Sequence, residues 1–360
     1  MRELLRDLER WQAQGKTVAW ARVVDLEGSG PRDPGAAMAV SGEGEVIGSV
    51  SGGCVEGAVV TEALDVLATG DRRLVTFGYS DDDAFAVGLT CGGTVHLFIE
   101  PFAGVPGLEA AIREHRPAVL ATVVDGPGAG DSLLLVEGAE AQGGLANADL
   151  QRVVQRDAEA ALAAGTTSVR RYGDCGEANE ASVTVFIEAF APPPRLLVFG
   201  AVDFTAALVR VAKVLGFHVT VCDAREVFAT KARFPLADEV VVDWPNRYLA
   251  EVGASLGPRD AVCVLTHDAK FDVPAIVAAL DTEVGYLGAM GSRRTTEQRA
   301  ERLREEGITD EQLERLLAPI GLDLGARTPE ETAVAICAEI IAHRTGRSAP
   351  RLRDGEGPIH

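Results

Sequence analysis

The stretch R-L-L-V-F-G at residues 195–200 decides the fold class of the C-terminal half of the chain. Its continuous apolar run is typical of a strand buried on both faces, and it ends in Gly200. A helical pattern follows at 206–216, and a second apolar strand, H-V-T-V-C-D, ends in Asp223. This order of strand, helix and strand predicts a parallel βαβ unit with an acid at the end of its second strand.

The alternation of strands and helices continues beyond this unit. Further apolar strands are predicted at 239–244, at 261–266 and within 283–294, with helical patterns between them. Strands that alternate with helices predict a doubly wound parallel sheet, and the acid roughly 20 residues beyond the first glycine is a Rossmann feature. We therefore expect a Rossmann-like domain at residues 195–345.

The last part of this domain is predicted to be helical. The patterns T-D-E-Q at 309–312 and T-P-E-E at 328–331 are those of capping boxes, which mark the starts of two helices. After about Arg344 the chain becomes polar, so residues 346–360 are predicted to form a frayed tail.

The glycine fingerprint of a dinucleotide site is broken in the first turn. After Gly200 the sequence has Val202 and Thr205 at the second and third glycine positions, and Asp203 would repel a phosphate. The sequence therefore predicts the Rossmann fold more strongly than it predicts a bound dinucleotide. Gly200 and Asp223 remain candidate residues for NAD(P) or another nucleotide.

Two other segments carry candidate ligand-binding residues, because ligands of such sheets lie at the carboxyl ends of the strands. T-H-D-A-K-F-D (266–272) follows one strand and supplies His267 and Asp268. G-A-M-G-S-R-R (288–294) follows another and combines a glycine turn, a helix start and arginines, which suits an anion. Its candidates are Gly291, Ser292, Arg293 and Arg294. The alternative is that the arginines are surface residues that pair with nearby glutamates.

The N-terminal half is organised around G-S-V-S-G-G-C-V-E-G at 48–57. Gly52 and Gly53 precede Cys54 at the predicted start of a helix, where backbone N–H groups and the local field favour a thiolate. A second cysteine loop, G-L-T-C-G-G at 88–93, holds Cys91 followed by Gly92 and Gly93. We expect the two loops to meet and to form the functional centre of this half. The alternative is that each cysteine is a small buried hydrophobe.

The sequence of the N-terminal half also has the pattern of a diverged internal duplication. V-A-W-A-R-V-V-D at 18–25 resembles A-V-L-A-T-V-V-D at 118–125, and H-L-F-I-E-P-F at 96–102 resembles T-V-F-I-E-A-F at 184–190. The matches keep their order, which favours a repeated unit. Aligned in this way, Asp149 and Asn179 stand where the first copy has Cys54 and Cys91. The alternative is that any two small α/β units share such strands.

These patterns predict an α/β chain that is divided into several domains. A first cysteine-loop domain is expected at 1–105 and a degenerate supporting repeat at 106–190. The stretch A-P-P-P at 191–194 is expected to be a short stiff linker.

Composition narrows the classes of function. The net charge of −20 argues against nonspecific binding to nucleic acid or to anionic membranes. The six cysteines include no C-x-x-C pair, which favours a reducing cytoplasm over a disulfide framework or a zinc ribbon. No apolar run is long enough to span a bilayer, and the N-terminal residues lack the apolar core of a signal peptide.

The motifs together resemble the XdhC/CoxI family. The resemblance rests on G-S-G-P-R-D-P-G-A-A-M, S-G-G-C-V-E-G, G-L-T-C-G-G, T-H-D-x-K-x-D, G-A-M-G-S-R-R-T and P-I-G-L-D-L-G-A-R-T-P-E-E-T-A, in this order along nearly the whole chain. It departs from the family pattern at Thr90, where the family usually has glycine, and in the first Rossmann turn. The resemblance implies an N-terminal cysteine-bearing domain and a C-terminal Rossmann-like domain.

The resemblance also implies a function. Family members are accessory factors that bind the molybdenum cofactor transiently, as molybdopterin or its dinucleotide form. They support its sulfuration by a cysteine desulfurase and insert it into a molybdenum hydroxylase of the xanthine dehydrogenase or CO dehydrogenase type. Such a protein is a cofactor-insertion chaperone more than a classical enzyme, and a homodimer would be reasonable.

The resemblance suggests roles for individual residues. Cys54 and Cys91 would lie near the metal, with Glu56 orienting the loop or exchanging protons, because a soft metal or its sulfido ligand favours thiolates. Gly52 and Gly53 would supply close backbone approach, and the phosphate would lie near Ser292 and Arg293.

Other classes of function stay open at this point. One is an enzyme, either an NAD(P)-linked oxidoreductase or a sulfur transferase that uses Cys54, which would carry a persulfide. Another is a purely structural role, for which Cys54→Ala and Cys91→Ala would leave the activity of the target enzyme unchanged.

Overall fold

The computed structural model describes residues 3–28, 30, 32–78, 93–177 and 180–354. The chain divides into two compact units, Met1–Pro192 and Pro193–Asp354, which are described separately below. The break between them falls inside the A-P-P-P stretch at 191–194.

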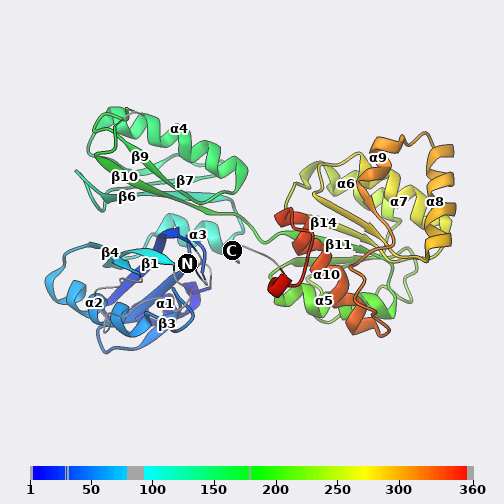
Figure 1. The fold of residues 1–360 in the computed structure, drawn as a ribbon, viewed down its shortest axis with the longest axis horizontal. Helices are drawn as coiled ribbons and strands as arrows, with labels where there is room; N and C mark the ends of the chain where they lie inside the picture. Colours follow the sequence, from blue (N-terminus) through cyan, green and yellow to red (C-terminus); the bar gives the residue numbers. More distant parts are fainter. Residues whose placement is uncertain (1–2, 29, 31, 79–92, 178–179, 355–360) are drawn as a thin grey trace. The chain divides into compact units, whose positions relative to one another are not determined.

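Unit 1 contains two copies of one arrangement of helices and strands (Figure 1). The first copy consists of α1 (Leu5–Ala13), β1 (Val18–Glu27), β2 (Ala37–Ser41), β3 (Val46–Gly48), α2 (Glu56–Thr69), β4 (Arg73–Phe77) and β5 (Thr94–Pro101). The second consists of α3 (Pro106–Arg113), β6 (Ala118–Asp125), β7 (Ser132–Val136), β8 (Gln142–Gly144), α4 (Ala148–Ala164), β9 (Ser168–Tyr172) and β10 (Val183–Phe190).

The sheets have the same strand order, β3-β2-β1-β5-β4 in one copy and β8-β7-β6-β10-β9 in the other. Register agrees as well: Glu100 lies opposite Trp20 in the first sheet, and Glu188 lies opposite Leu120 in the second. Identical element order, strand order and register support the duplication predicted from sequence.

The two sheets of unit 1 pack face to face, and each has a helix on its outer face. α2 covers the first sheet and α4 covers the second, each over its own buried apolar cluster (Figure 1). Between the sheets lies a small cluster that includes Val24 and Phe98 of the first copy and Val124 and Phe186 of the second. α2, the first sheet, the second sheet and α4 therefore form successive layers, and α1 and α3 pack with the inner faces of the two sheets in a further buried cluster.

A buried arginine joins the two copies at this interface. Arg22 is 0 % exposed, and its guanidinium donates to Glu100 at 2.6 Å and to Glu188 at 3.4 Å. Its Cζ also lies 4.2 Å from the centre of the Trp20 ring, a cation–π contact. Burial raises the pKa of Glu188 although Arg22 lies beside it. One positive charge thus holds a glutamate from each copy.

Unit 2 is a doubly wound sheet, which confirms the fold class predicted from sequence. Its elements are β11 (Arg195–Phe199), α5 (Asp203–Val214), β12 (His218–Cys222), β13 (Glu239–Val241), α6 (Pro245–Val252), β14 (Ala261–Val264), α7 (Ala269–Leu280), β15 (Tyr286–Ala289), α8 (Arg293–Glu305), α9 (Asp310–Glu314), β16 (Leu316–Leu317) and α10 (Pro329–Thr345). All neighbouring strands pair in parallel in the order β13-β12-β11-β14-β15-β16. This is the Rossmann strand order, with its switch point between β11 and β14.

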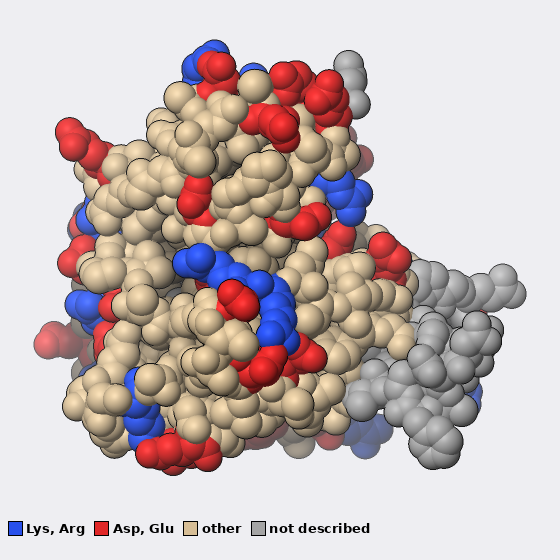
Figure 2. Space-filling view, turned by 90° about the vertical axis from the view of Figure 1, so that its left-hand side faces the viewer, with Lys and Arg blue, Asp and Glu red and all other residues tan. Residues whose placement is uncertain are grey.

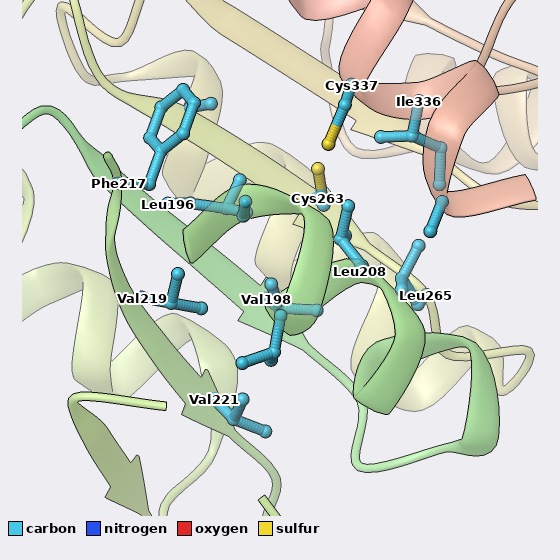
Figure 3. Packing of buried hydrophobic residues seen from close by; sticks show 14 of the residues in the cluster. Leu196, Val198, Leu208, Phe217, Val219, Val221, Cys263, Leu265, Ile336 and Cys337 are labelled. Atoms are coloured by element: carbon cyan, nitrogen blue, oxygen red, sulfur yellow. The ribbon is translucent and has the colours of Figure 1, made fainter. Parts of the chain in front are cut away.

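Helices cover both faces of this sheet. α5 and α10 pack on one face, and α6, α7 and α8 pack on the other. Figure 3 shows the first face, where the sulfur atoms of Cys263 and Cys337 point toward one another among aliphatic side chains. Burial raises the pKa of both thiols, so these two cysteines are small core hydrophobes.

Local signals account for several helix boundaries in unit 2. Both predicted capping boxes are confirmed, with Thr309 capping α9 and Thr328 capping α10. The helix predicted at 206–216 begins earlier, at Asp203, because an acid in the first turn is favourable at a helix N-terminus. The turn between β11 and α5 is therefore only three residues, Gly200 to Val202.

Candidate functional site

The cysteine loop of unit 1 connects β3 to α2. Gly52 and Gly53 have φ angles of 74° and 120°, a region that favours glycine, so both glycines are needed for the turn. Cys54 follows them, and α2 begins two residues later at Glu56 with Val55 as its N-cap. The side chain of Cys54 is half-buried and packs against the apolar cluster beneath α2. This places the thiol beside a helix N-terminus, as predicted.

Glu56 fixes the shape of this loop. Its Oε1 accepts hydrogen bonds from the hydroxyl of Ser49 at 2.6 Å and from the backbone N–H of Ser51 at 2.9 Å. Its Oε2 accepts from the backbone N–H of Gly53 at 2.9 Å and from the hydroxyl of Ser51. Partial burial alone would raise the pKa of Glu56, but these hydrogen bonds outweigh it and lower the pKa to about 2. The carboxylate is therefore ionised near neutral pH, which favours orienting the loop over exchanging protons.

We expect Glu56→Gln to lower stability by about 1–3 kcal/mol at pH 7, because the amide NH₂ would face donors that now bond to a carboxylate. The pKa of Glu56 is lower in the folded state, so its contribution is present above about pH 4.5 and is lost as pH falls toward about 2. Urea unfolding at pH 7 and at about pH 3 checks this. Glu62→Gln, on the same helix, is the control. The same deficit at both pH values would contradict the assignment.

A positive residue that sequence reasoning did not single out lies against this loop. The Nε of Arg32 donates to the backbone carbonyl of Ser49 at 3.4 Å. Arg32 belongs to the motif G-S-G-P-R-D-P-G between β1 and β2, which contributed to the family resemblance but gave its arginine no predicted role. Of the predicted partner loop, Cys91 and Gly92 lie outside the described residues, and Gly93 is buried directly before β5.

The second copy has a different site at the corresponding place. Asn147 caps α4, and its Nδ2 lies 3.6 Å from the sulfur of Cys175 in the segment after β9. A cavity of about 220 Å³ lies there, lined in part by Asp131 and Asp174. Asp149, aligned with Cys54, is in the first turn of α4 and pairs with Arg152. Asn179, aligned with Cys91, lies outside the described residues.

In unit 2 the backbone of the turn between β11 and α5 forms hydrogen bonds to other residues of the protein. A Cβ on Gly200, whose φ is 115°, would lie 2.8 Å from Cγ2 of Thr266, so glycine is needed for close approach to β14. The N–H of Ala201 donates to Asp223 at 2.8 Å, and the guanidinium of Arg233 donates to the Ala201 carbonyl at 3.1 Å. The turn therefore bonds to the protein at the point where a dinucleotide site would bond to pyrophosphate.

Asp223 has an internal role of the same kind. It is 3 % exposed, and it accepts three hydrogen bonds from the backbone and side chain of Arg225 at 2.7–2.9 Å. Burial would raise the pKa of Asp223, but the bonds from Arg225 and Ala201 lower it. The structure thus explains Gly200 and Asp223 without a nucleotide.

A buried polar network connects β14, α7, β15 and α8, and sequence reasoning missed its role. Asp272 accepts hydrogen bonds from the hydroxyl of Thr266 and from Nη2 of Arg299 at 2.9 Å. The same Nη2 donates to the Met290 carbonyl at 2.7 Å. Asp272 and Arg299 are 4 % and 3 % exposed. The one available signal was that Asp272 closes the T-H-D-x-K-x-D motif.

The other predicted residues of unit 2 lie at exposed helix starts. His267 is exposed, and Asp268 caps α7 by accepting from the N–H of Lys270 at 3.1 Å. Ser292 caps α8 by accepting from the N–H of Thr295 at 3.1 Å. Arg293 and Arg294 are exposed, and neither has an ion pair within the described residues. The predicted pairing of these arginines with glutamates is therefore not observed there.

The topology brings these unit 2 residues to one edge. Gly200, Asp223, His267, Asp268 and the 291–294 segment all follow the carboxyl ends of parallel strands. In the part of the chain that the structure describes, no group of three or more His, Cys, Asp or Glu side chains could hold a metal ion. No helix in the same part is long and apolar enough to cross a membrane.

This combination defines a class of protein: a duplicated α/β unit with a glycine-rich cysteine loop, followed by a Rossmann unit. Two family models match, the XdhC and CoxI family at residues 11–78 and the XdhC Rossmann domain at residues 196–340. The chain belongs to the XdhC and CoxI family, as the sequence motifs predicted.

Curated relatives agree with this assignment. A Bacillus subtilis protein named as a probable xanthine dehydrogenase component is 28% identical over 90% of this chain and 92% of its own length. The molybdenum cofactor insertion chaperone PaoD of Escherichia coli is 26% identical over 95% of this chain and 88% of its own. A solved structure described as a xanthine dehydrogenase from Bacillus halodurans has a TM-score of 0.73 and 24% identity, and covers 96% of both chains. That likeness shows the fold.

Proposed function

We propose that this protein is an accessory factor that binds the molybdenum cofactor and inserts it into a molybdenum hydroxylase. The observation that carries the proposal is Cys54, a half-buried thiol on a glycine loop that an ionised glutamate holds in shape. A thiolate is a suitable ligand for a soft metal or its sulfido group. The relative named as a molybdenum cofactor insertion chaperone supports the same interpretation.

Roles are assigned within each unit. In unit 1, Cys54 acts with Cys91 at the metal end of the cargo, Glu56 orients the loop, and the neighbouring glycines allow close approach of the backbone. These glycines are Gly52, Gly53, Gly92 and Gly93. In unit 2, the start of α8 binds phosphate through Gly291, Ser292, Arg293 and Arg294, and His267 and Asp268 lie on the same sheet edge.

The partners follow from the chemistry of the cargo. The target is a molybdenum hydroxylase of the xanthine dehydrogenase or CO dehydrogenase type, and a cysteine desulfurase supplies the terminal sulfur. The cargo is molybdopterin or its dinucleotide form. The protein works in the cytoplasm, as a homodimer.

Nucleic acid is not a proposed partner. On the face drawn in Figure 2, acidic and basic side chains are interspersed, and acidic groups lie directly beside the larger group of basic ones. Nucleic acid binding depends on a concentrated basic surface, and the net charge of the chain is −20.

Two enzyme functions have weaker support. An NAD(P)-linked oxidoreductase is disfavoured because the β11–α5 turn already bonds to Asp223 and Arg233. A sulfur transferase that uses Cys54 is the second candidate, because the same thiol could carry a persulfide. Mass spectrometry of the protein after incubation with a cysteine desulfurase and cysteine distinguishes this candidate.

The test of the proposal is cofactor transfer. The protein, loaded anaerobically with molybdenum cofactor, is mixed with a cofactor-free molybdenum hydroxylase, and the activity that appears is compared with the activity from free cofactor at equal concentration. We expect faster and more complete activation by the loaded protein. Equal activation by free cofactor would contradict the proposal.

A further inference from the structure

Arg299 is a buried arginine with one nitrogen left unpaired. Its Nη2 bonds to Asp272 and to the Met290 carbonyl, which holds the guanidinium in place. Its Nη1 is fully buried and has no hydrogen-bond partner among the residues that the structure describes. A buried charged donor without an acceptor is costly, so this nitrogen is expected to have a partner that the chain itself does not supply.

The unpaired nitrogen lies behind a glycine at a helix start. A Cβ on Gly291 would come within 3.5 Å of Nη1, and within 3.3 Å of the side chain of Thr295. Gly291 has no positive φ angle, so the backbone does not require glycine here. The glycine avoids a tight contact with the Thr295 side chain and adds no side-chain atom beside Nη1.

The same place is favourable for an anion. α8 has 13 residues, and its first-turn N–H groups and macrodipole favour negative charge. Arg293 and Arg294 stand exposed on this first turn. Asp272, which faces Arg299, is already bonded to that guanidinium. The local charge is therefore positive on a chain that is acidic as a whole.

We propose that Nη1 of Arg299 and the backbone at Gly291 bind an oxygen of a phosphate monoester, and that Arg293 and Arg294 mainly attract it. This rests on the proposed function only for the identity of the cargo that carries the phosphate. Salt screens exposed charges such as those of Arg293 and Arg294, whereas hydrogen bonds to Asp272 and Met290 hold Arg299 in place. Arg299 therefore sets the geometry of the site.

The first test measures the binding of inorganic phosphate to the full-length protein by ³¹P NMR. We expect Gly291→Ala to weaken binding about 10- to 100-fold, the cost of losing a charge-assisted hydrogen bond. Gly257→Ala is the matched control, because a Cβ there meets nothing within 4 Å. Arg294→Gln should weaken binding only a few-fold, and this loss should disappear at high salt. Arg299→Lys should match Gly291→Ala if it folds.

Each outcome supports or overturns the proposed phosphate site. Weaker binding in Gly291→Ala, with Gly257→Ala unchanged, supports the proposal. No phosphate binding by the folded parent, or equal binding by the parent and Gly291→Ala, overturns it and leaves a trapped water as the partner of Nη1. The same variants titrated with molybdopterin and with a nucleoside monophosphate distinguish the two sources of phosphate. Phosphate binding without any cofactor binding would contradict the proposed function and leave this site standing.

Discussion

Cys54→Ala is expected to fold normally and to reduce the activity of a co-expressed molybdenum hydroxylase by about 10- to 100-fold, the range found when a group that supports a metal site is removed. The side chain is half-buried and lies at a loop, so its loss opens no large cavity. What is lost is the sulfur atom beside the α2 N-terminus. The measurement is target activity and molybdenum content in cells that carry each variant.

The second copy supplies the matched control. Cys175→Ala removes the exposed cysteine of the second copy, in the segment between β9 and β10, and should leave the target enzyme unchanged. Cys54→Ser should behave like Cys54→Ala, because a hydroxyl is not a soft ligand. Full target activity in Cys54→Ala, with the variant expressed at the parent level, would remove Cys54 from the mechanism.

Arg22→Ala is expected to lower the stability of unit 1 by about 3–5 kcal/mol, because it leaves Glu100 and Glu188 buried without their shared cation. The same residue supports the contact between the two sheets, so its loss weakens the interface that joins the copies. Urea unfolding, monitored by tryptophan fluorescence, checks this. Trp11 and Trp20 of unit 1 contribute to the signal.

The pH dependence of this deficit has a defined sign. Burial raises the pKa of Glu188 in the folded state, so its protonated form is the better one to bury. Without Arg22 that pKa rises further, and the variant should recover stability relative to the parent as pH falls from 8 toward 5. Arg22→Met combined with Glu188→Gln should recover most of the loss, because Glu100 keeps Trp20 and Arg72. An Arg22→Ala protein as stable as the parent would contradict the account.

Local patterns were enough to predict most of the fold. Continuous apolar strands such as 195–200 are typical of a parallel sheet covered on both faces, and their alternation with helices predicted the fold of unit 2. The repeat in unit 1 was predictable because V-V-D and F-I-E recur in the same order along the chain. The sequence could not show that the two copies pack through Arg22, since that contact joins residues far apart in the chain.

Some residues of the candidate site were predictable from local sequence, and others were not because their roles depend on contacts with residues distant in the chain. Cys54 and its glycines carry a local signal, because the turn requires positive φ angles just before a helix. Arg299 carries none, because it lies among the many charged residues of α8 and its burial depends on Asp272 from another helix. Asp223 was assigned from its place after a strand, while its partners depend on where Ala201 and Arg225 lie in space.

The most direct test of the central claim is an anaerobic titration of the purified protein with molybdenum cofactor, together with Cys54→Ala and Cys175→Ala. The account predicts saturable binding by the parent and by Cys175→Ala, and loss of that binding in Cys54→Ala. Absence of binding by a folded parent, or equal binding by all three proteins, would contradict it.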